Sequence, residues 1–147
     1  MTIILDTSAV LATFDEDQQE HRAVAMALRT ALRSAGGEPL VVSPMVVAEA
    51  DYLLHTRLGA TAARAFARDV AAEAYELASW DAEDHADAVE VTTGYRDGYV
   101  DITDAAKVVL ADRYRTTRLL TLDQRHFHAL RPLWGANSFT LLPLDES

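Results

Sequence analysis

Near its start the chain reads Thr2-Ile3-Ile4-Leu5-Asp6-Thr7-Ser8, a short apolar run that ends in a carboxylate and two hydroxyls. The run predicts a buried strand over residues 2–5, with Asp6 at its carboxyl end. In open α/β sheets, ligands bind outside the carboxyl ends of the strands, where the strand order reverses. Asp6 is therefore a candidate site residue, although an aspartate that only caps the next helix would occupy the same position.

Downstream of this run, further apolar segments alternate with helical patterns. Strands are predicted at residues 40–42, 75–78, 119–122 and 139–142. Helices are predicted through roughly 17–35 and over 44–57, 60–73, 81–93 and 102–115. Strands that alternate with helices are typical of a mostly parallel sheet covered on both faces. The 147 residues (1–147) fit a single domain with a real core.

Three more acids stand at helix starts or strand ends, namely Glu49, Asp104 and Asp123. If the first and fourth strands are neighbours, Asp6 and Asp123 face each other at the carboxyl edge of the sheet. Glu49 and Asp104 would then come in from helices beside that edge. Carboxylate oxygens suit Mg²⁺ or Mn²⁺, because hard cations prefer hard ligands. The sequence therefore predicts an acidic site for a divalent cation.

Composition excludes several other classes of protein. The chain has no cysteine, which rules out disulfides, a thiolate zinc site and a cysteine nucleophile. No apolar run approaches the roughly 20 residues of a membrane helix, and the N-terminus lacks a signal-peptide pattern, so we expect a soluble cytoplasmic protein without membrane contact. The net charge of −10 argues against a general nucleic-acid coating protein. Residues 105–131 are locally basic, which fits either an RNA-guiding patch or ordinary solvated arginines.

Taken in order, these segments resemble the PIN-domain family and, within it, the VapC-type toxins of bacterial toxin–antitoxin pairs. The resemblance implies a three-layer α/β/α sandwich, a divalent metal held by acids, and endoribonuclease activity that hydrolyses RNA phosphodiester bonds. Matched position by position, the four family acids are Asp6, Glu49, Asp104 and Asp123. Ser8 matches a residue that helps to position the metal or its water. The segments that carry the match are Ile4-Leu5-Asp6-Thr7-Ser8-Ala9, Ser43-Pro44 through Val47-Ala48-Glu49, Thr103-Asp104-Ala105-Ala106, and Leu120-Thr121-Leu122-Asp123-Gln124-Arg125-His126-Phe127.

The third acid has two candidates, because Asp101 lies three residues before Asp104. We favour Asp104, which stands 19 positions before Asp123, a spacing similar to that in the family. Asp101 is then interpreted as the N-cap of the helix. We assign Asp6 and Asp104 as direct ligands of Mg²⁺ or Mn²⁺, Asp123 as a ligand or water-mediated partner, and Glu49 as an outer ligand or general base.

The resemblance also implies partners: an RNA substrate, a VapB-like antitoxin and a second copy in a homodimer. An alternative hypothesis is a PIN-like protein-binding module with a silent nuclease site. An Asp-nucleophile phosphatase is disfavoured, because Ser8 replaces the usual second aspartate two residues after Asp6. His126 and His128 would lie on one side of an extended stretch, but no third nitrogen ligand follows to make a zinc site. Phe127 between them is predicted to enter the core.

Overall fold

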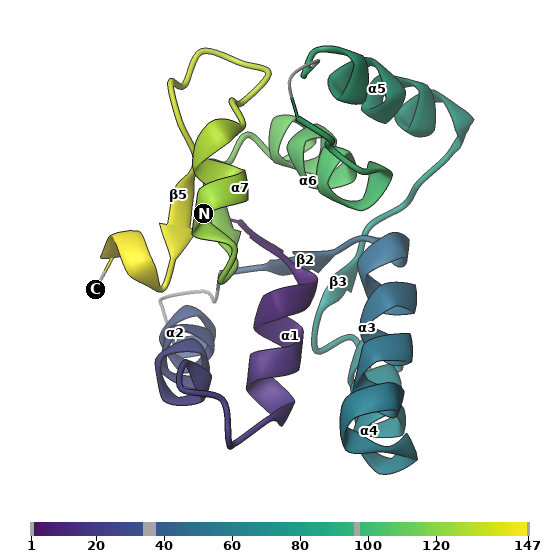
Figure 1. Ribbon diagram of the computed structural model, residues 1–147, viewed down its shortest axis with the longest axis vertical. Coiled ribbons are helices and arrows are strands. Elements are labelled where there is room, and N and C mark those ends of the chain that lie inside the picture. Colours follow the sequence, from purple (N-terminus) through teal and green to yellow (C-terminus); the bar gives the residue numbers. More distant parts are fainter. Residues whose placement is uncertain (1, 34–37, 96–97, 147) are drawn as a thin grey trace.

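The computed structural model describes residues 2–33, 38–95 and 98–146 (Figure 1). Among them, five strands form one sheet in the order β3-β2-β1-β4-β5, and every neighbouring pair is parallel. The strands are β1 (Ile3–Leu5), β2 (Leu40–Val42), β3 (Glu76–Leu77), β4 (Arg118–Leu120) and β5 (Thr140–Leu142). The first and fourth strands are neighbours, which is the condition on which the predicted acidic site depends. The strand order reverses between β1 and β4, which is where an open sheet forms its ligand crevice.

Helices cover both faces of the sheet, as Figure 1 shows, with α1 to α4 on one side and α5 and α6 on the other. The helices are α1 (Thr7–Phe14), α2 (His21–Arg33), α3 (Pro44–Leu58), α4 (Ala60–Ala71), α5 (Ala82–Thr93), α6 (Ile102–Arg113) and α7 (Gln124–Ala129), followed by a 3-10 turn (Leu144–Glu146). The predicted three-layer α/β/α sandwich is confirmed. No helix among the described residues is long and apolar enough to cross a membrane.

The core lies in two halves, one on each face of the sheet. Ile3 and Leu5 of β1 pack with α1 to α4, whereas Ile4 packs with α5, α6 and Phe127 of α7. Successive side chains of a strand point to opposite faces. Because both faces are buried, the strand reads in the sequence as an unbroken apolar run. The prediction that Phe127 enters the core is confirmed, since its side chain is fully buried.

Two predicted boundaries are wrong. The chain forms two helices, α1 and α2, where one was predicted through roughly 17–35, and α1 begins directly after Asp6. Five of the eight residues of α1 are buried, so its sequence lacks the polar face by which an amphipathic helix is recognised. The end of the predicted helix, residues 34–35 with the glycines at 36–37, lies outside the described residues. Strand β4 ends at Leu120, two residues earlier than predicted.

Candidate functional site

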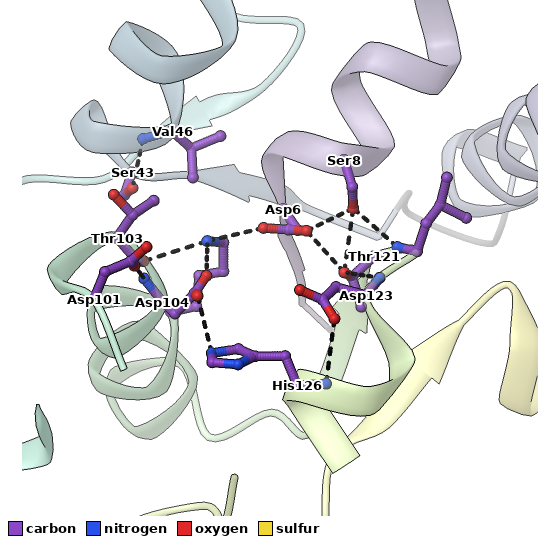
Figure 2. A network of polar contacts seen from close by, with 12 residues as sticks. Asp6, Ser8, Ser43, Val46, Asp101, Thr103, Asp104, Thr121, Asp123 and His126 are labelled. Carbon is purple, nitrogen blue, oxygen red and sulfur yellow. Dashed lines mark hydrogen bonds and ion pairs between the residues drawn. The ribbon is translucent and has the colours of Figure 1, made fainter. Parts of the chain in front are cut away.

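Asp6 follows the carboxyl end of β1, next to the carboxyl end of β4, and two hydroxyls bind its carboxylate (Figure 2). Both donate to Oδ2, the Ser8 Oγ at 2.6 Å and the Thr121 Oγ1 at 2.8 Å. Each hydroxyl also accepts a backbone N–H, from Leu122 at 2.9 Å for Ser8 and from Asp123 at 3.0 Å for Thr121. Asp6 stands at the N-cap position of α1 but makes no side-chain cap bond. The Asp6 carboxylate therefore binds the hydroxyls of Ser8 and Thr121 and does not cap α1.

The other oxygen of Asp6 faces a buried ammonium. Lys107 Nζ lies 2.9 Å from Asp6 Oδ1 and 3.0 Å from Asp104 Oδ1, and it donates to the carbonyl oxygen of Thr103 at 3.3 Å. The ring of Phe127 approaches the same ammonium, with 5.6 Å between Nζ and the ring centroid. The Lys107 side chain is only 1% exposed. Helix α6 is buried along most of its length, which explains how it can carry a lysine inside the protein.

The pKa values of these three groups shift in directions that follow from the contacts. Burial alone would raise the pKa of Asp6, but Lys107 and the two hydroxyls outweigh it and hold the pKa below its usual value. Burial would lower the pKa of Lys107, but Asp6 and Asp104 together raise it. The pKa of Asp104 is raised by burial, with Lys107 opposing and Asp101 and Asp6 adding to the rise. Asp6 and Asp104 both contact Lys107, and Asp6, which also accepts two hydroxyl hydrogen bonds, is the better stabilised anion.

His126 closes the network on the far side of Asp104. Its Nε2 lies 2.9 Å from Asp104 Oδ2, a contact that is an ion pair when the ring is protonated. Nε2 makes no hydrogen bond with a described residue at this contact. His126 and His128 lie in helix α7, and the extended stretch predicted for them is wrong. His128 points to another partner, Asp145, at 3.4 Å.

Asp101 and Asp104 play different parts at the start of α6. Asp101 accepts the backbone N–H of Asp104 at 2.9 Å, so the N-cap predicted for Asp101 is confirmed. The Asp104 carboxylate instead contacts Lys107 and His126 (Figure 2). The contacts favour Asp104 over Asp101 as the third acid of the site.

The side chains of the two remaining acids make no hydrogen bond or ion pair with Asp6, Asp104 or Lys107 in the residue ranges that the structure describes. Asp123 is exposed, and its Oδ1 accepts the backbone N–H of His126 at 3.2 Å, which caps α7. The Thr121 hydroxyl accepts the backbone N–H of Asp123 and donates to Asp6, so it links the two residues. Glu49 is exposed in the second turn of α3, and it makes no ion pair or hydrogen bond with any residue that the structure describes. The metal and catalytic roles of these two acids stay predictions.

The donor set suits a hard cation of the magnesium type. Mg²⁺ commonly takes one or two carboxylates and completes its shell with water and substrate phosphates. Asp6 and Asp104 are two such carboxylates, already directed at one cation, the ammonium of Lys107. Within the described part of the chain, no three Asp, Glu or His side chains form a ready group for a metal. The residues therefore fit an open site completed by water and substrate, and they do not form a closed cage.

The sequence did not reveal three members of the network: Thr121, Lys107 and His126. Thr121 lies inside the predicted strand 119–122, and Lys107 belongs to the locally basic stretch 105–131. A signal was present, because Lys107 interrupts the apolar run Ala105-Ala106-Lys107-Val108-Val109-Leu110 three residues after Asp104. A lysine in such a run predicts a buried ion pair with the acid one helical turn earlier.

The PIN domain family matches residues 3–131, a span that begins just before Asp6 and includes Asp123. The chain belongs to the PIN-domain family. This PIN domain is 48% identical over 141 residues to "Ribonuclease VapC26" of Mycobacterium tuberculosis, an alignment that covers 96% of the chain and 100% of the relative. The predicted resemblance to VapC-type proteins is confirmed.

Two solved structures with the same fold are VapC20 and VapBC2. VapC20 of Mycobacterium tuberculosis, described as a Sarcin-Ricin loop cleaving toxin, superposes with a TM-score of 0.75 at 18% identity, covering 83% of this PIN domain and 90% of VapC20. VapBC2 from Rickettsia felis, solved with a DNA fragment from its promoter, gives a TM-score of 0.64 at 15% identity, with 85% and 90% covered. At these identities the likeness shows the fold alone.

Proposed function

We propose that this PIN domain is a Mg²⁺- or Mn²⁺-dependent endoribonuclease that acts in the cytoplasm as the toxin of a VapBC-type toxin–antitoxin pair. The name and full-length similarity of the VapC26 relative support the ribonuclease activity. One observation in the structure carries the proposal: Asp6 from the end of β1 and Asp104 from the start of α6 direct carboxylate oxygens at one cation. They do so at the edge of the sheet where the strand order reverses, the place at which open α/β sheets bind ligands.

In this proposal Asp6 and Asp104 hold the ion, with Asp123 beside them as a third ligand or water-mediated partner. When bound, the ion supplies Lewis-acid stabilisation of phosphoryl charge and lowers the pKa of water. Ser8 and Thr121 donate to Oδ2 of Asp6 and so fix the rotamer of the carboxylate that would hold the ion. Glu49 would accept the proton of the water that attacks phosphorus. The bond from the water oxygen to phosphorus would form as the bridging P–O bond breaks, and the departing oxygen would take a proton from solvent.

Cleavage of an RNA panel, with Mg²⁺ or Mn²⁺ and with EDTA, tests the proposal. Asp6→Asn and Asp104→Asn should each lower the rate at least about 100-fold, because even outer partners of metal ligands change affinity or activity roughly 10–100-fold. Asp101→Asn is a matched control, since asparagine caps helices as well as aspartate does. Asp112→Asn is a second control, because it removes an acid of α6 that lies outside the network and pairs with Arg115. Cleavage that survives in Asp6→Asn, or that EDTA does not stop, would refute the proposal.

A silent site is the second candidate function, and Lys107 is the observation that favours it. The ammonium already neutralises part of the charge on Asp6 and Asp104, so a PIN domain of this kind can be assembled without a metal. In that case no RNA in the panel would be cut with either ion, and Asp6→Asn would bind the protein partner as the wild type does.

We also propose a VapB-like antitoxin as partner. The Rickettsia felis neighbour is a VapBC complex, and the net charge of −10 favours a partner segment with basic side chains. Such a side chain would reach the exposed carboxylates of Asp123 and Glu49. The family resemblance further implies a homodimer. Co-expression with the neighbouring reading frame, followed by size-exclusion chromatography with light scattering, measures both assemblies.

A further inference from the structure

We infer that Lys107 is the resident cation of the acidic site: it holds Asp6 and Asp104 together in the metal-free protein, and it weakens the binding of the divalent ion that these carboxylates take up. The inference rests on the proposed function in one respect, namely that Asp6 and Asp104 are the metal ligands. It assigns to this chain a metal site that is assembled before the metal arrives and whose affinity is set by an internal ammonium.

The contacts of Lys107 leave it no other role in the site. An ammonium has three N–H donors, and those of Lys107 are directed to Asp6, Asp104 and the carbonyl of Thr103. Phe127 covers the same group, and only 1% of the side chain is exposed. No donor remains for a substrate phosphate, and solvent scarcely reaches the nitrogen. Lys107 therefore acts on the carboxylates and is a positioning residue.

The choice of residue is specific as well. Of the 13 Lys and Arg residues in the chain, Lys107 is the only lysine. A lysine ammonium is a compact point charge, whereas arginine presents a planar fork that suits bidentate contacts. Between two carboxylates of different elements and a backbone carbonyl, the compact charge makes three separate contacts. The chain places its one lysine at the position where an ion-sized cation fits.

Electrostatics gives Lys107 opposite effects on the metal-free and metal-bound states. Two neighbouring carboxylates repel each other without a cation, and an uncompensated buried charge strongly destabilises a fold. Lys107 removes that cost when no ion is present. A divalent ion bound to the same two carboxylates lies close to the ammonium, where repulsion between like charges is weakly screened. The same contacts that assemble the site thus oppose its loading.

Lys107→Met tests the inference, because methionine keeps a similar length without the charge. Direct titration with Mn²⁺ should show affinity at least roughly tenfold tighter than wild type, as expected for removal of one nearby positive charge. The metal-free variant should also unfold at a lower temperature than wild type and regain stability with Mn²⁺. A merely structural role for Lys107 would leave the affinity unchanged or weaken it, and that result would overturn the inference.

Two controls define the site in this titration. Arg113→Met removes a cation from the far end of the same helix, where it pairs with Asp84, and it should leave the Mn²⁺ affinity within about twofold of wild type. Asp6→Asn should abolish the tight site and leave only weak binding to surface acids. An equal gain of affinity in Arg113→Met would mean that net charge alone is responsible, which also overturns the inference.

The wild type offers a measurement that needs no stable variant. Labelling with ¹⁵N-lysine gives a single side-chain amine signal, because Lys107 is the only lysine. Saturating Mn²⁺ should broaden that signal beyond detection, while Mg²⁺ should shift it without broadening. A signal unchanged by Mn²⁺ would overturn the inference. If the signal is unchanged by Mn²⁺ but RNA cleavage still requires metal, the inference fails and the proposed function holds. If the signal broadens but no RNA is cut, the inference holds and the proposed function fails.

Discussion

At the scale of single residues, the site is organised around one buried carboxylate, that of Asp6. Taking a charge out of water is costly unless it is paired and hydrogen-bonded. Asp6 meets that requirement completely: Oδ2 receives the Ser8 and Thr121 hydroxyls and Oδ1 faces the ammonium of Lys107. The hydroxyls in turn accept the backbone N–H groups of residues 122 and 123. The position of the acid is thus set by strand β1 and by the loop that follows β4.

Replacement of Thr121 by valine should destabilise the protein by about 1–3 kcal/mol, because the change removes a donor to Asp6 and strands the backbone N–H of Asp123. Thr7→Val is the matched control: its buried Oγ1 has no hydrogen-bond partner among the described residues, so the change should be neutral or slightly stabilising. Urea unfolding measures both. Equal losses for the two variants would show that the Thr121 hydroxyl contributes nothing specific.

At the scale of elements, aspartates at the first turns of helices make hydrogen bonds and ion pairs that hold the helices in place. Asp81 and Asp84 form a reciprocal capping box at the start of α5, with both hydrogen bonds at 2.9 Å. Arg113 of α6 pairs with Asp84 at 2.8 Å and so joins the two helices. The bond from the Asp81 backbone is the main cause that lowers the pKa of Asp84; burial opposes it, and Arg113 lowers the pKa further.

The capping box predicts a pH-dependent contribution to stability. A carboxyl whose pKa is lower in the folded state stabilises the fold above its unfolded pKa, near 3.8, and loses that effect as the pH falls through the folded pKa. Asp84→Ala should therefore cost about 1 kcal/mol at neutral pH. The difference from wild type should shrink as the pH falls below about 4. Asp87→Ala, at an exposed position of the same helix, is the control; a difference for Asp84→Ala that is independent of pH would contradict the assignment.

The sequence predicts an element well when its apolar residues lie on one face. It predicts an element less well when apolar residues lie on all sides or when the element is short. The parallel sheet, its order at β1 and β4, and helices α3 to α6 follow from the pattern. Helix α1 was missed because it is buried on most sides, and α7 because six residues with alternating histidines look extended. The acids were found because their type and position carry the chemistry. The burial of Lys107 does not show in a count of charges over residues 105–131; it shows only in the apolar run that this lysine interrupts.

At the scale of the whole molecule, the fold pairs most cations of the locally basic stretch 105–131 with acids of the same chain. Lys107 is buried in the acidic site, and Arg113, Arg115 and Arg118 pair with Asp84, Asp112 and Glu38. Arg131 donates to the carbonyl of Asn137 but stays exposed. Arg113 and Arg115 are exposed as well, but each has a carboxylate partner at the surface. Among the described residues of this stretch, Arg125 and Arg131 are the exposed cations without a carboxylate partner, and they are the first candidates to meet RNA phosphates.

Salt dependence of RNA binding tests these two candidates. Each phosphate neutralised on a single strand contributes a slope of roughly −0.7 to the dependence of log K on log salt concentration, so two cations predict a total slope between about −1 and −2. Binding of Asp6→Asn to a single-stranded RNA, which should not be cut, is measured by fluorescence anisotropy over a range of NaCl concentrations. The double variant Arg125→Gln with Arg131→Gln should bring the slope close to zero, because the acidic remainder of the surface repels phosphate. A slope steeper than about −4 would require several more cations than this stretch exposes, and would place the RNA-binding surface elsewhere on the molecule.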